Sequence, residues 1–151
     1  MSKRYWQDLT PGQVLWSEPV IIERQGLLAF ARQFDPQPMH TDPEAARALG
    51  FDDIICPGTY TLALATRALV TIDLALMPSG LGLQLDYQRP VYIGDTLRLR
   101  FEIADMQSSR KPGRGQLSTR QAFVNQRQET ALAITGEYFI ALRDEAATGI
   151  T

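Results

Sequence analysis

The segment FDPQPMH, residues 34–40, brings a carboxylate and an imidazole close together in the chain. Asp35 precedes His40, the single histidine of the sequence, by five positions, and two prolines stand between them. An acid and a base within hydrogen-bonding reach of one water molecule can take a proton from it and return a proton to a substrate. Prolines restrict the backbone, which favours a fixed geometry for the pair. The structural alternative is a turn in which His40 only satisfies backbone carbonyl groups.

The residues on either side of this segment predict two short helices. Residues 25–34 carry apolar side chains at helical spacing, which is typical of an amphipathic helix that ends at Asp35. Residues 41–50 predict a second helix, with Thr41 and Glu44 at the spacing of a capping box and Gly50 at its end. His40 is therefore expected on a stiff connection between two helices.

The remainder of the chain predicts one long helix and a set of strands. Residues 59–76 are apolar on nearly every side, which indicates a buried helix. Residues 81–88 and 97–103 alternate between apolar and polar side chains, as strands do, and YIGDT at 92–96 predicts the turn between them. Further strands are expected at 20–23 and 131–142, with a turn at 125–128. An antiparallel sheet wrapped around the long helix, an α+β fold, would bury both.

Length and composition narrow the class of protein. A chain of 151 residues is expected to form a single domain, residues 1–151. Fifteen basic and seventeen acidic residues give a net charge of -2, so no basic field would recruit nucleic acid. No apolar run reaches the ~18 residues of a membrane span, and no secretory signal is recognisable. With one cysteine, a cytoplasmic protein without disulfides is expected. One histidine and no paired carboxylates predict no metal site.

A longer stretch around the acid and base resembles a known signature. The sequence FARQFDPQPMHTDPEAA, residues 30–46, resembles the hydratase motif of the MaoC-like dehydratases and (R)-specific enoyl-CoA hydratases. That motif has an aspartate, then Asn-Pro two positions on, an aliphatic residue, a histidine and a later small residue. The resemblance extends to CPGTYTLAL, to QRPVYIGDTLRLRFEI and to GRGQLSTRQAFVNQRQE. The positions that match the motif here are Asp35, Gln37, Pro38, Met39, His40 and Ala46.

The resemblance implies a fold and a reaction. The fold would be the hot-dog fold, a curved antiparallel sheet around a central helix. The reaction would be addition of water to trans-2-enoyl-CoA to give (R)-3-hydroxyacyl-CoA, or the reverse. Asp35 would be the main acid/base and His40 would bind and orient the water, although the sequence does not divide these roles. Coenzyme A enters as part of the substrate, and no separate cofactor is implied.

The same resemblance assigns a role to the start of the long helix. Backbone amides at Gly58 and Thr59 would hold the thioester oxygen, since the first amides of a helix lack intrahelical partners and carry positive charge. The alternative is an ordinary helix start with Gly58 or Thr59 as the N-cap. Pro57 stands where the family often has His or Ser and cannot donate an amide. Phe34 replaces the usual Gly and Gln37 the usual Asn, which concerns pocket width and acyl-chain preference.

Further expectations concern substrate binding and oligomerisation. Arg110, Lys111 and Arg114 crowd the loop SSRKPGRGQ and could bind coenzyme A phosphates; the alternative is a solvated loop. Cys56 is interpreted as a small buried filler. A homodimer or higher homo-oligomer is expected, because one hot-dog unit leaves open sheet edges. The functional alternatives are a hot-dog acyl-CoA thioesterase and a non-catalytic acyl-CoA-binding subunit. Acyl length, branching, carrier and direction stay open.

Overall fold

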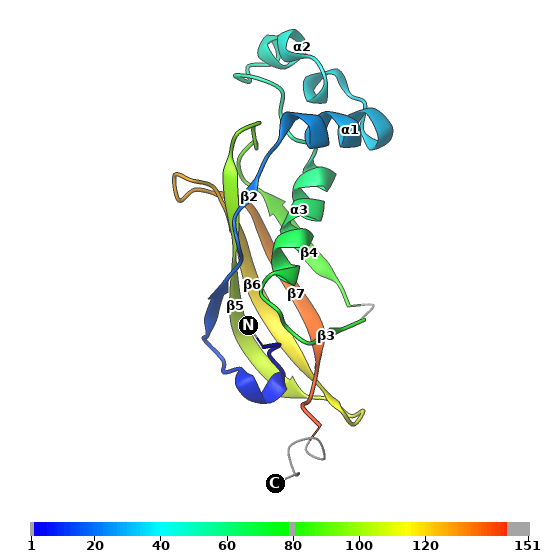
Figure 1. Ribbon diagram of the computed structural model, residues 1–151, viewed down its shortest axis with the longest axis vertical. Helices are drawn as coiled ribbons and strands as arrows, with labels where there is room; N and C mark the ends of the chain where they lie inside the picture. Colours follow the sequence, from blue (N-terminus) through cyan, green and yellow to red (C-terminus); the bar gives the residue numbers. More distant parts are fainter. Residues whose placement is uncertain (1, 79–80, 145–151) are drawn as a thin grey trace.

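The computed structural model describes residues 2–78 and 81–144. Within these described residues, three α-helices, two short 3-10 helices and seven strands follow one another (Figure 1). Their order and bounds are η1 Trp6–Asp8, β1 Val14–Trp16, β2 Val20–Ile21, α1 Arg24–Phe34, η2 Pro38–His40, α2 Pro43–Ala48, α3 Gly58–Val70, β3 Leu76–Met77, β4 Leu83–Tyr87, β5 Thr96–Ser108, β6 Arg114–Val124 and β7 Thr130–Ala141.

The strands form one antiparallel sheet whose centre is the long ladder β5-β6-β7. β1 and β2 pair with β5 on one side, and β3 and β4 pair with β7 on the other. Figure 1 shows α3 lying across one face of this sheet, with α1 and α2 gathered at one end of the molecule. The face toward α3 is apolar: in the first part of β5 every second residue is fully buried, namely Leu97, Leu99, Phe101 and Ile103. The predicted α+β arrangement, a sheet wrapped around the long helix, is confirmed.

Helix α3 is shorter than the sequence predicted and is buried on one side only. It ends at Val70, and Asp73 then adopts a left-handed backbone with a φ of 60°, which no helix continues through. Leu76 instead pairs with Ile140 in β3. Residues 72–76 alternate at strand spacing, so pairing with β7 outcompetes the helix. Val70 is 74% exposed, and the prediction of a helix buried all round was wrong for this chain.

The local predictions near the acid and base hold with small corrections. α1 begins at Arg24 rather than residue 25. α2 spans only Pro43–Ala48, and its N-cap is Asp42, whose carboxylate accepts from the Glu44 amide at 3.0 Å. The predicted capping box at Thr41 was therefore wrong, because Pro43 favours the first helical position and sets the cap at the residue before it.

The turn in the connection between β4 and β5 lies where the sequence predicted it, although the two strands do not pair with each other, since β4 pairs with β7 and β5 with β6. Gly94 has a φ of 91°, a conformation that favours glycine, and the Asp95 carboxylate accepts from the Tyr92 amide at 2.9 Å. β5 runs on to Ser108, well past the predicted end at residue 103. β1, which the sequence did not suggest, is a three-residue strand against β5.

Candidate functional site

Asp35 and His40 lie in contact. Asp35 Oδ2 is 3.3 Å from His40 Nε2, and the two residues belong to the ends of neighbouring helical turns, α1 and η2. The Asp35 amide donates to the Ala31 carbonyl, which fixes the carboxylate at the last turn of α1. The imidazole is buried, with 6% of its side chain exposed, whereas 24% of the Asp35 side chain is exposed. The stiff proline segment therefore brings the acid and the base together.

The backbone around His40 determines which ring nitrogen faces Asp35. His40 Nδ1 lies 2.7 Å from the carbonyl oxygen of Ile55, which can only accept a hydrogen bond. Nδ1 therefore carries a proton, and Nε2 is the ring nitrogen that faces Asp35. A carboxylate oxygen and an imidazole nitrogen side by side are suited to exchange a proton with a water molecule that lies against them.

Gln37 holds the other oxygen of the Asp35 carboxylate. Its side-chain amide donates to Asp35 Oδ1 at 2.7 Å, which leaves Oδ2 directed at His40. Phe34, in contrast, is 65% exposed and packs against Phe30, with ring centroids 5.1 Å apart. Neither Phe34 nor Gln37 lines the pocket described below.

The segment 55–58 links His40 to the start of α3. The Ile55 amide donates to the Met39 carbonyl at 3.1 Å, so Ile55 bonds to the His40 turn through both of its backbone groups. The Cys56 amide donates to the Val91 carbonyl at 2.8 Å, which holds the segment against the connection between β4 and β5. The position of the imidazole relative to α3 is therefore set by backbone hydrogen bonds.

Helix α3 presents two amides without an acceptor in the helix. Its N-cap is Pro57, whose carbonyl accepts from the amides of Tyr60 and Thr61, both at 3.0 Å. The amides that precede these two belong to Gly58 and Thr59, and they carry the positive end of the helix dipole. The alternative in which Gly58 or Thr59 is the N-cap was wrong. The first turn can therefore receive negative charge that develops on a substrate oxygen.

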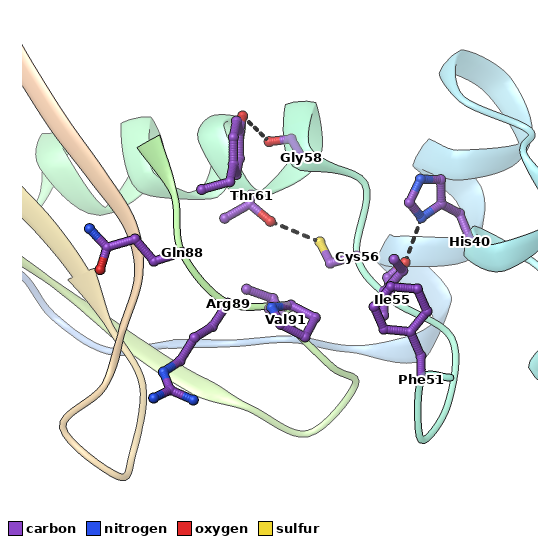
Figure 2. Close-up of a pocket in the computed structure, with 11 residues that line it drawn as sticks. His40, Phe51, Ile55, Cys56, Gly58, Thr61, Gln88, Arg89 and Val91 are labelled. Atoms are coloured by element: carbon purple, nitrogen blue, oxygen red, sulfur yellow. Dashed lines mark hydrogen bonds between the residues drawn. The ribbon is translucent and has the colours of Figure 1, made fainter. Parts of the chain in front are cut away.

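A pocket of about 330 Å³ joins His40 to this first turn (Figure 2). Figure 2 shows His40 on one side and Gly58 at the helix start, with Cys56 between them. Most of the wall is apolar or aromatic, as is typical of small-molecule sites. Asp35 is not part of the wall and contacts His40 from behind it. The lining residues are His40, Phe51, Ile55, Cys56, Gly58, Thr61, Tyr87, Gln88, Arg89, Pro90 and Val91.

Several of these wall residues were not predicted as site residues. Phe51 follows α2, and Tyr87 ends β4, far from the Asp35 motif in the sequence. Arg89, the only arginine of the wall, forms an ion pair with Glu129 at 2.7 Å. Residues 88–91, QRPV, belong to a stretch that resembles the family, but their residue types do not indicate that they line the pocket with His40.

Cys56 is a protonated thiol inside this pocket. The Thr61 hydroxyl donates to its sulfur at 3.4 Å, and the residue is 7% exposed. Burial raises the pKa of Cys56 to about 11, with the Thr61 hydrogen bond opposing the shift. A thiol with this pKa is inert at neutral pH, as a buried packing residue should be.

The basic loop lies away from the pocket. The β5–β6 turn that carries Arg110 and Lys111 is at the end of the molecule opposite α1 and α2 (Figure 1). Arg114 is partly occupied there, since its guanidinium lies 3.6 Å from the centre of the Phe139 ring and its Nε donates to Ser109 at 3.1 Å. A single chain therefore does not bring these cations to the Asp35 and His40 pair.

Within residues 2–78 and 81–144, no three His, Cys, Asp or Glu side chains are grouped as a metal ion would require. None of the helices there has the length and apolar character needed to cross a membrane.

Comparison with known proteins shows the family to which this chain belongs. The MaoC-like domain matches residues 7–123. A UPF0336 protein of Streptomyces avermitilis is 33% identical over 101 residues, which are 61% of this chain and 67% of that protein. The MaoC-like dehydratase from Rhodospirillum rubrum has a TM-score of 0.84 and 31% identity, over 93% of this chain and 99% of that one. The (R)-hydratase from A. caviae involved in PHA biosynthesis has a TM-score of 0.64 and 28% identity, over 91% and 99%.

The chain belongs to the MaoC-like domain family, and its fold is the hot-dog fold. The resemblance noted in the sequence is thereby confirmed over most of the chain. The family includes (R)-hydratases, among them the A. caviae and Pseudomonas aeruginosa enzymes.

Proposed function

We propose that the protein adds water to trans-2-enoyl-CoA thioesters to give (R)-3-hydroxyacyl-CoA, or removes water in the reverse direction. The observation that carries the proposal is the contact between Asp35 and His40, made where His40 lines the same pocket as the first turn of α3. The pair supplies proton transfer and reaches the cavity through His40, and the turn supplies charge stabilisation from the wall of the same cavity.

The reaction follows from these two groups with atoms and electrons balanced. A water molecule against Asp35 Oδ2 and His40 Nε2 gives a proton to the pair as its oxygen bonds to C3 of the enoyl group. The electrons of the C2–C3 double bond move toward the thioester oxygen, where the Gly58 and Thr59 amides hold the resulting enolate. The proton held by the pair then passes to C2, and the enolate collapses back to the thioester. The pair ends in its starting state.

The amides at the helix start carry a large share of the barrier reduction in this scheme. Loss of one donor to a developing oxyanion typically costs about 3 kcal/mol or more. The largely apolar wall strengthens such hydrogen bonds, because apolar surroundings lower the local dielectric constant. The (R) configuration is supported by the (R)-hydratases of A. caviae and Pseudomonas aeruginosa among the similar structures.

We also propose that the protein works as a homodimer or a higher homo-oligomer. β4 pairs with β7 on one side, and its Leu83 and Tyr87 side chains are each 48% exposed. Open strand edges favour pairing with another chain. In such an assembly Arg110, Lys111 and Arg114 of a second copy would be the ones to meet coenzyme A phosphates, since those of the same chain lie at the far end.

The test is a spectroscopic assay with crotonyl-CoA. The enoyl-thioester absorbance should fall while a thiol reagent detects no released coenzyme A, and the product should be (R)-3-hydroxybutyryl-CoA. Release of thiol at the rate of absorbance loss would instead indicate a thioesterase. No change with short, long or branched enoyl-CoA, or with an acyl-carrier-protein thioester, would indicate a binding subunit.

A further inference from the structure

Tyr87 connects the edge of the sheet to the first turn of α3. Its hydroxyl donates to the Gly58 carbonyl at 2.7 Å, across 29 positions of sequence. The residue ends β4, where it pairs with Leu132 of β7, so the ring is anchored by the sheet. Tyr87 also lines the pocket that contains His40.

The Tyr87 ring leaves little room for a side chain at position 58. A Cβ atom added to Gly58 would lie 3.1 Å from two ring carbons of Tyr87 and 3.3 Å from its hydroxyl oxygen. These distances are tighter than ordinary carbon contacts, and the ring is held by its own hydrogen bond. Gly58 is thus explained by close approach of an aromatic ring, since its backbone does not require a positive φ.

The hydrogen bond acts on a particular amide. The Gly58 carbonyl and the Thr59 N–H belong to one planar peptide unit, so fixing the direction of the oxygen fixes the direction of the N–H. Donation to a carbonyl also polarises the peptide unit and strengthens its N–H as a donor. Tyr87 therefore aims the Thr59 amide and makes it a stronger donor.

The phenol keeps its proton under working conditions. Burial raises the pKa of Tyr87 above its ordinary value, and the nearby Cys56 adds to the shift. A phenol in this state donates throughout the neutral and mildly alkaline range.

We propose that Tyr87 is a positioning residue for the oxyanion site, one that orients and strengthens the Thr59 amide toward the thioester oxygen and leaves little room for a side chain at position 58. The proposal rests on the hydratase function proposed above. It adds a residue from the sheet edge to a site otherwise built from the Asp35 segment and the start of α3.

Tyr87→Phe separates the hydroxyl from the ring. The substitution keeps the ring against Gly58 and removes only the hydrogen bond, so kcat for crotonyl-CoA hydration should fall by about tenfold, part of the effect of losing a whole oxyanion donor. KM should stay within about twofold, because the interaction matters most in the transition state. Tyr92→Phe, in the connection between β4 and β5 and outside the pocket wall, is the matched control and should keep wild-type kcat. An unchanged kcat in Tyr87→Phe, or an effect on KM alone, would overturn the positioning role.

A second experiment tests the contact without using activity. Gly58→Ala should lower Tm in the wild-type background, where the methyl group meets the Tyr87 ring. In a Tyr87→Ala background the same change should leave Tm unchanged or raise it, since alanine favours helix over glycine. An equal effect in both backgrounds would overturn the steric part of the proposal. If the wild-type protein hydrates no enoyl thioester, the proposed function is wrong. The comparison of Tm values in the two backgrounds still tests the contact between Gly58 and the Tyr87 ring.

Discussion

Replacing Asp35 by asparagine removes the charge of the acid–base pair while almost preserving its shape. The Ile55 carbonyl holds a proton on His40 Nδ1, so Nε2 is the ring nitrogen that faces position 35 across 3.3 Å. Asparagine keeps the size and polarity of the side chain but has no carboxylate that can accept a proton from water. The variant therefore loses the carboxylate that takes part in proton transfer.

The expected loss of activity is large and the expected loss of stability is small. A positioned acid or base contributes about 100-fold to 10,000-fold, so kcat should fall by about 100-fold or more. The Asp35 side chain is 24% exposed, and a partly exposed pair of this kind contributes about 1 kcal/mol or less to folding. For a domain of this size that corresponds to a change in Tm of at most about 4 °C.

The assay is kcat for crotonyl-CoA at saturating substrate, with Tm measured on the same samples. Asp42→Asn is the control, because Asp42 is a nearby carboxylate that caps α2 and asparagine is an equally good cap. His40→Gln added to Asp35→Asn should cost little beyond the single change, since residues of one catalytic unit are not additive. If Asp35→Asn kept more than about a tenth of wild-type kcat, the assignment of Asp35 as acid/base would be refuted.

Three further predictions concern other parts of the molecule. Replacing Arg110 and Lys111 by glutamine should raise KM for coenzyme A thioesters at low salt, and a KM that does not respond would leave the loop as a solvated turn. Iodoacetamide should alkylate Cys56 about 100-fold more slowly at pH 8 than an ordinary thiol, because its pKa is raised from 9.0 to about 11 and only the thiolate reacts; a rate that levels off by pH 9 would contradict this. Asp95→Ala removes the acceptor of the Tyr92 amide and should lower the free energy of unfolding by about 2 kcal/mol in a urea titration, whereas no change would show that this bond contributes nothing.

The sequence predicted the features that depend on neighbours in the chain. The contact of Asp35 with His40 needs only a short segment stiffened by prolines, and the helix before it needs only its own periodicity. The turn between β4 and β5 was likewise predicted by glycine and aspartate at residues 94 and 95. These features were set by local backbone preferences, which residue types report directly.

Features that depend on pairing between distant segments were missed. Residues 72–76 suit both helix and strand, and only the presence of β7 decides between them. Tyr87 and Arg89 reach the pocket because β4 lies beside the start of α3. The residue types of β4 alone do not predict this position. A bond from His40 to a backbone carbonyl was anticipated as the structural alternative for this segment, but the sequence did not identify Ile55 as the partner. Because the buried imidazole makes this bond, His40→Ala is expected to destabilise the fold by about 1–3 kcal/mol.

The position of the basic loop shows that the length of a strand determines which side chains can reach a site. Ending β5 at Ser108 instead of residue 103 extends it by five residues, roughly 17 Å at the rise of a strand. That extension carries Arg110 and Lys111 toward the far end of the sheet. Their charge was evident from the sequence, but their distance from His40 depended on how far β5 and β6 stay paired.

The central claim is that Asp35 and His40 direct water onto the enoyl double bond, and oxygen-18-labelled water tests it most directly. Crotonyl-CoA incubated with the wild-type protein in labelled water should yield intact (R)-3-hydroxybutyryl-CoA with the label on the C3 hydroxyl, and Asp35→Asn should yield almost none, as measured by mass spectrometry with chiral separation. Label found instead in the carboxylate of free crotonate, or a labelled product of (S) configuration, would contradict the account.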